Sequence, residues 1–170
     1  MAATAALAAE VGRLEAAAAA MLAMREEVEA RAPWPLAPIW GVEPEANWGP
    51  PELLAHVEEY LRYWMGEIER VLDGDGNAPV PFGRVATDAL RLGVIGRDRA
   101  LPSRELFARI EADAARVAKR LAELDEAAAS KRGLHPTRGE LTVREMLEPF
   151  LVGHTEGHVT QLREVLAAAR

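Results

Sequence analysis

The stretch LVGHTEGHVTQL, residues 151–162, places His154 and His158 four positions apart among apolar residues. A helix turns by about 100° per residue, so side chains four positions apart lie on one face, one turn above the other. On such a helix both imidazoles point in the direction of the apolar stripe that contains Leu151 and Leu162. The stretch therefore predicts a long amphipathic helix with two histidines on its buried face.

Three further segments show apolar residues at the three- and four-residue spacing of a buried helix face, over residues 3–30, 50–72 and 102–130. Alanine and leucine, which are strong helix formers, supply most of the apolar content, whereas only 5% of the residues are aromatic. Valine and isoleucine are sparse, which disfavours a sheet. We therefore expect an all-α fold, a four-helix bundle that forms one domain over residues 1–170.

The segments between these helices differ in character. Residues 32–51 contain six prolines, which end the first helix, and three tryptophans, Trp34, Trp40 and Trp48. Tryptophans in a loop suggest a packed cover, which we expect to form the apolar wall of a site. Residues 78–101 are ambiguous, with a possible short helix over 87–94 that glycines would break. The expected bundle thus has long loops between its first and second, and second and third, helices.

The last helix has its own start and bend signals. Thr142 and Glu145 form the T-x-x-E pattern of a capping box, which typically opens a helix. Pro149 lies inside this helix and should bend it just before His154, because proline removes a backbone hydrogen bond.

Two imidazoles on one inward face each bring a donor and an acceptor into the core, which hydrogen bonds alone satisfy with difficulty. A metal ion would accept one lone pair from each ring. The alternative is a pair of hydrogen-bonded histidines without metal. His56 is the candidate for a third ligand, at the edge of the second helix's apolar stripe, although it also fits an interface histidine satisfied by a neighbour. His135, beside Pro136 in an expected turn at 133–139, is interpreted as a surface residue.

Several site classes are excluded by the residues that are present. The chain has no cysteine, so disulfides, thiolate metal sites and cysteine nucleophiles are absent. The H-E-x-x-H pattern fails because Thr155 follows His154, and Glu156 falls on the solvent face. No histidine follows a glutamate by three positions, as a two-metal carboxylate site would require, so one ion is favoured.

Charge and hydropathy limit the partners. The net charge of −7 and the lack of a basic cluster argue against a nucleic-acid partner. No stretch reaches the ~20 apolar residues that span a bilayer, so no membrane role is expected. Residues 2–9 lack a basic region and are interpreted as the start of a helix and not as a signal peptide. We therefore expect a cytoplasmic protein.

Two segments resemble the DinB/YfiT-like family of metal-binding four-helix bundles. The sequence WGPPELLAHV, residues 48–57, is similar to the opening of that family's second helix. Residues 141–166, with a threonine cap, an H-x-x-x-H pair and a following Gln-Leu, are similar to its last helix. Pro149 and the loop rich in proline and tryptophan depart from the family pattern, but neither removes a ligand.

The resemblance implies a site in which His56, His154 and His158 hold one divalent transition metal, with water completing the shell. Imidazole suits zinc, nickel, iron and copper alike. Several family members use such an ion to activate a low-molecular-weight thiol, so the leading expectation is a thiol-dependent transferase acting on a small-molecule substrate. A hydrolase and a non-catalytic, stress-associated metal-binding bundle are the alternatives. Because related bundles often pair and alanines at 16–20 allow close helix approach, we also expect a homodimer.

Overall fold

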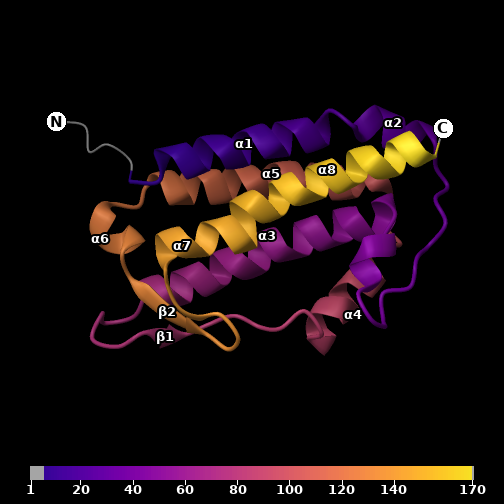
Figure 1. Ribbon diagram of the computed structural model, residues 1–170. Coiled ribbons are helices and arrows are strands. Elements are labelled where there is room, and N and C mark those ends of the chain that lie inside the picture. The colour runs from indigo at the N-terminus through magenta and orange to yellow at the C-terminus, as the bar shows by residue number, and fades with distance from the viewer. Residues whose placement is uncertain (1–5, 170) are drawn as a thin grey trace.

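The structure is a computed structural model that describes residues 6–169, and it is mostly helical with one small sheet (Figure 1). Its longest helices are α1 (Ala8–Leu22), α3 (Pro50–Leu72), α5 (Ser103–Ala122) and α8 (Gly153–Ala168). α1 contacts α5 and α8, and α3 contacts the same two helices. Each long helix therefore packs against two others, and all of them contribute residues to one apolar core.

The expected first helix is interrupted. It divides into α1 and α2 (Arg25–Ala30), and its residues 3–5 lie outside the described part of the chain. At the break the Met24 N–H donates to the Met21 carbonyl at 3.1 Å, an i to i−3 bond that tightens the chain by a fraction of a turn. Met24 and Val28 are both buried, so the tighter turn keeps the apolar face of α2 directed at the core.

The second expected helix is confirmed at its predicted bounds by α3, and Glu52 in its first turn is fully buried. The Glu52 carboxylate accepts from the Gly49 N–H at 3.2 Å and from the Ala37 N–H at 3.0 Å. It also accepts from the Arg99 guanidinium at 3.1 Å. One carboxylate thus joins the start of α3 to the proline-rich loop and to the chain after α4 (Ala89–Asp98).

The proline-rich loop contains a short helix, η1 (Pro44–Asn47), and its tryptophans differ in burial. Trp48 is buried and its Nε1–H donates to the Pro38 carbonyl at 3.1 Å. Trp34 is half-buried, whereas Trp40 is 58% exposed. The expectation of a packed cover is therefore correct for Trp48 and wrong for Trp40.

The ambiguous segment 78–101 contains α4, which begins and ends later in the chain than the expected helix over 87–94. The helix continues through Gly93 and Gly96, so the prediction that these glycines break it was wrong. A Cβ atom at Gly96 would lie 2.7 Å from Cδ1 of Ile39, which shows that glycine here allows the proline-rich loop to pack closely on α4. The contact with the loop offsets the low helix propensity of glycine.

A three-stranded sheet takes two strands from around the turn predicted at 133–139 and one from the ambiguous segment 78–101. β1 (Val80–Pro81) is parallel to β2 (Arg132–His135), and β2 is antiparallel to β3 (Gly139–Thr142). In Figure 1 the sheet lies at one end of the helices, beside α3. The expected third helix over 102–130 ends earlier than predicted, as α5 followed by the short α6 (Glu126–Ala129).

Tertiary contacts explain why this sheet forms without many β-branched residues. Gly133 on β2 has no room for a side chain, because a Cβ atom there would lie 2.5 Å from Phe82 and 2.8 Å from Met146. Packing against these distant residues fixes the strand. The expected all-α fold is therefore corrected by the presence of a small sheet.

The last helix consists of two α-helical parts, α7 (Val143–Leu147) and α8, separated by the π-helical segment η2 (Glu148–Val152). The predicted capping box is confirmed, since Thr142 Oγ1 accepts from the Glu145 N–H at 3.2 Å and the Glu145 carboxylate accepts from the Thr142 N–H at 2.8 Å. The π-helical turn contains Pro149, whose ring disrupts ordinary α-helical bonding.

Within residues 6–169, no helix has both the length and the apolar character needed to cross a bilayer.

The π-helical turn yields a stability prediction. A Cβ atom at Gly153 would lie 2.7 Å from the Glu148 carbonyl oxygen, whereas one at Gly157, on the same helix, would meet nothing within 4 Å. We expect Gly153→Ala to lower the free energy of unfolding by about 1–3 kcal/mol through overpacking. We expect Gly157→Ala to raise it by up to about 1 kcal/mol through helix propensity. Urea denaturation followed by circular dichroism measures both, and equal effects would contradict the role given to Gly153.

Candidate metal centre

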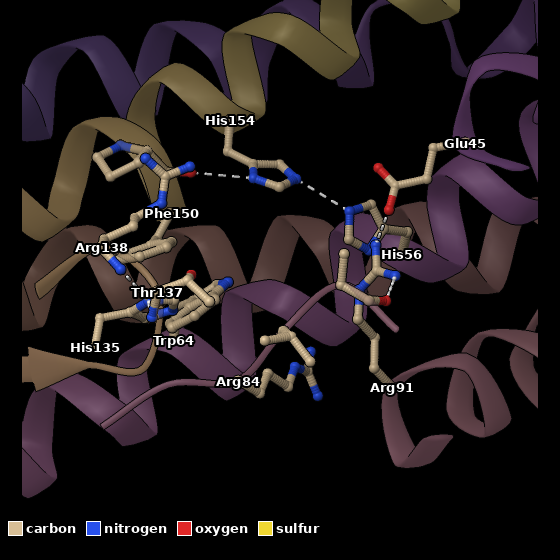
Figure 2. Close-up of a pocket in the computed structure, with 13 residues that line it drawn as sticks. Glu45, His56, Trp64, Arg84, Arg91, His135, Thr137, Arg138, Phe150 and His154 are labelled. Carbon is tan, nitrogen blue, oxygen red and sulfur yellow. Dashed lines mark hydrogen bonds and ion pairs between the residues drawn. The ribbon is translucent and has the colours of Figure 1, made fainter. Parts of the chain in front are cut away.

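Three histidines from two helices converge at the interface of α3 and α8. His56 comes from α3, His154 and His158 come from α8, and one ring nitrogen from each lies within 4.8 Å of the others. The Nε2 atoms of His56 and His154 are 3.0 Å apart, as Figure 2 shows by a dashed line. The structure therefore brings together the three residues that the sequence predicted as ligands, in a group that could hold a metal ion.

Hydrogen bonds at the Nδ1 atoms of His154 and His158 fix the tautomers of these two rings. The His154 Nδ1 atom lies 3.2 Å from the Pro149 carbonyl oxygen, which can only accept, so Nδ1 carries the proton. The Gln161 Nε2 atom donates to the Glu45 carbonyl at 2.7 Å, which leaves the Gln161 oxygen facing His158 Nδ1 at 3.1 Å. Both rings therefore present an unprotonated Nε2, as metal-bound histidines do when their other nitrogen donates to an outer acceptor.

Burial keeps all three imidazoles neutral at pH 7. Burial, followed by the nearby charges of His158 and Arg91, lowers the pKa of His56 well below its ordinary value. Burial, with a further contribution from His158, lowers the pKa of His154 to about 4. Burial also lowers the pKa of His158 to about 4. Neutral rings keep the lone pairs that a metal ion requires.

The donor set is of a kind that could hold a metal ion. Two imidazole nitrogens bound about 2.1 Å from one ion stand roughly 3.0–3.4 Å apart at ordinary bond angles. The observed separation of 3.0 Å between His56 and His154 falls in that range, whereas the three nitrogens together are only as close as 4.8 Å. The buried Nδ1 atom of His56 has no hydrogen-bond partner within residues 6–169, so this ring lacks the outer acceptor that the rings of His154 and His158 have.

Tyr60 and Thr155 join the two helices beside the histidines. The Thr155 hydroxyl donates to the Leu151 carbonyl at 2.6 Å, so the Tyr60 hydroxyl, 2.6 Å from Thr155 Oγ1, is the donor in that pair. Burial raises the pKa of Tyr60 far above its ordinary value, and the hydrogen bond with Thr155 lowers it by a smaller amount. Tyr60 therefore stays protonated, and its ring, 4.5 Å from that of His154, is a fixed wall of the site.

A cavity of about 370 Å³ opens beside His56 and His154 (Figure 2). Its walls combine aromatic rings with charged groups. The aromatic and imidazole side chains are Trp64, Phe150 and His135, and the charged ones are Glu45, Arg84, Arg91 and Arg138.

His135 is buried in this wall, so the prediction of a surface histidine was wrong. Its ring stacks on Phe150 with centroids 5.1 Å apart, and its Nδ1 accepts from the Thr137 N–H at 3.2 Å. Burial lowers the pKa of His135, so the ring is neutral at pH 7. The signal that was missed is the alternation along β2, where Gly133 and His135 are buried while Leu134 is 48% exposed.

The wall of the cavity is not the one predicted from the tryptophan-rich loop. Trp48 reaches the cluster, with its ring edge-on to His56 at 5.4 Å, but it does not line the cavity. The aromatic surface comes instead from Trp64 of α3 and Phe150 of η2, whose rings stack 4.0 Å apart. Of the charged wall residues, Arg84 and Arg91 lie in the ambiguous segment 78–101, where no periodic signal pointed to them.

Comparisons with protein-family models, with curated proteins and with solved structures find no match. The candidate site therefore depends on its geometry and on the chemistry of its donors.

Metal content is the first test of this site. Purified protein should carry about one divalent transition metal ion per chain, the load of a single three-histidine site. His154→Ala and His158→Ala should each lose the ion, because two imidazoles hold it far less tightly. Elemental analysis measures the content. Glu156→Gln is the matched control on the same helix, because Glu156 pairs with Arg13 on the outer face; full metal retention in the double histidine variant would end the metal interpretation.

The outer hydrogen bonds give a second test. Gln161→Met removes the acceptor from His158 Nδ1 at similar side-chain volume, so metal affinity should fall about 10–100-fold. Competition with a chromophoric chelator measures the affinity. Thr160→Ala, one position away and exposed, should leave it unchanged. An unchanged affinity in Gln161→Met would show that this hydrogen bond does not support the site.

Proposed function

We propose that this chain is a metal-dependent enzyme of the DinB/YfiT-like type, a single-domain four-helix bundle that holds one divalent transition metal on His56, His154 and His158. The observation that carries the proposal is the convergence of these imidazoles, two of them with Nδ1 anchored outward, beside a cavity. Three protein ligands leave coordination positions open, which is typical of catalytic sites, whereas structural zinc sites are closed by four.

The reaction that the site supports best is transfer of a low-molecular-weight thiol to an electrophile. The ion, when bound, supplies a positive charge that lowers the pKa of the thiol. The chain has no cysteine, so the thiol must come from solution. In the reaction the thiol sulfur forms a bond to an electrophilic carbon, the leaving group departs with its electron pair, and the thiol proton passes to solvent.

The chain's own residues bind and orient the reactants. A cavity of about 370 Å³ is within the size range of small-molecule sites, and it places an electrophile next to His56 and His154. Trp48 and Tyr60 pack edge-on against the His56 ring, with centroids 5.4 and 5.1 Å away, and exclude water from that side of the cluster. The reacting groups therefore meet at a partly dry, preorganised surface.

Activity tests the proposal directly. Metal-loaded protein should accelerate conjugation of small thiols to 1-chloro-2,4-dinitrobenzene, and the acceleration should persist below the ordinary thiol pKa of ~8.5. Chelated protein and His56→Ala should lose it, because both lack the complete site. Absorbance of the product measures the rate, and Glu156→Gln serves as the active control.

If a panel of thiols and electrophiles reacts no faster with metal-loaded than with chelated protein, the transferase proposal fails. A protein that binds metal without this activity would then be the non-catalytic metal-binding bundle.

A further inference from the structure

The cavity beside the histidines is cationic, although the chain as a whole has a net charge of −7. Arg84, Arg91 and Arg138 line it, against the single carboxylate of Glu45. The carboxylate that pairs with Arg84 belongs to Glu59, which does not line the cavity. Glu59 and Glu45 offset the charges of Arg84 and Arg91, so Arg138 is the lining residue whose charge favours a negatively charged ligand.

Two of these arginines are held in place by the protein. The Arg84 side chain is 11% exposed, pairs with Glu59, and lies 3.6 Å from the centroid of the Tyr63 ring. The Arg91 side chain is 7% exposed, pairs with Glu45, and donates to the Ala86 carbonyl at 2.8 Å. Their positions are fixed before any ligand arrives, and the charge of each is offset by the carboxylate with which it pairs.

Arg138 differs, because its guanidinium makes no ion pair with any residue in the part of the chain that the structure describes. It lies in the β2–β3 turn, where its backbone N–H donates to His135 Nδ1 at 3.3 Å. Its guanidinium lies 5.5 Å from the centroid of the Phe150 ring. The turn thus positions a planar fork of N–H donors that is free to bind a ligand.

The wall next to Arg138 is aromatic. Trp64 and Phe150 stack with an interplanar angle of 16°, and the His135 ring lies near both, with its centroid 5.1 Å from that of Phe150 and 6.1 Å from that of Trp64. Figure 2 shows Arg138, Phe150, His135 and Trp64 gathered on one side of the cavity, with His154 and His56 across it. A ligand that spans the cavity therefore meets an anion-binding group and an aromatic surface at one end, and the histidine cluster at the other.

We propose that the cavity binds a carboxylate-bearing substrate with a flat, unsaturated body, whose carboxylate pairs with Arg138 and whose body packs on Phe150 and Trp64. A single free guanidinium matches the two oxygens of one carboxylate, whereas a doubly charged phosphate would need further free donors. The assignment of this ligand as the electrophile rests on the proposed function, but its binding does not.

The test uses benzoate as the probe and metal-free, chelator-treated protein, so that no metal can bind the carboxylate. Isothermal titration calorimetry should show tighter binding of benzoate than of benzamide, which has the same shape without the charge. Arg138→Gln should weaken benzoate binding about tenfold, the effect of losing a charge-assisted hydrogen bond. Arg138 is exposed, so the variant should fold.

The matched control is Arg104→Gln, which removes the same charge from an exposed arginine on α5 that does not line the cavity. It should leave benzoate affinity unchanged. Equal binding of benzamide and benzoate, or equal benzoate affinity in wild type and Arg138→Gln, would overturn the proposal. Benzoate binding by a protein that loads no metal would support the cavity assignment and reject the metal-dependent function. Metal loading without benzoate binding would reject the cavity assignment and leave the metal site supported.

Discussion

The burial of three neutral imidazoles between α3 and α8 is the constraint on which the rest of the structure depends. Each ring nitrogen placed in a dry interface needs a partner. The chain provides one through the Pro149 carbonyl, which the π-helical turn directs at His154, and another through Gln161. The unusual winding of the last helix, with Gly153 at its end, is thus part of the support for the site.

The support of His158 also involves the loops. Gln161 keeps its orientation because it donates to the backbone carbonyl of Glu45 in η1, while the Glu45 carboxylate pairs with Arg91 of α4. The proline-rich loop and α4 are therefore joined at the point where they support His158. The Glu52 carboxylate makes a second connection of this kind, because it accepts hydrogen bonds from the loop, from the start of α3 and from Arg99.

Those parts of the structure that depend on local sequence could be predicted. The 3.6-residue periodicity locates α3 and places His154 and His158 on one face, because both are properties of a single helix. The convergence of His56 with them depends on how two distant helices pack; its place at the edge of an apolar stripe made it a candidate, and the resemblance of two segments implied that it joins the other two. The sheet and the burial of His135 were missed because contacts with Phe82 and Phe150, far away in the chain, decide them. The arginines of the cavity lie in turns and short elements without periodicity.

The β2–β3 hairpin supplies His135 and Arg138 to the cavity but none of the clustered metal-site histidines, which all come from the long helices. This separation has an evolutionary consequence. Substitutions in the hairpin can change which molecules the cavity admits without altering the packing of α3 against α8. A lineage could therefore diversify its substrates by varying a short exposed turn while keeping the same packed helices. A library of engineered variants could target the same turn.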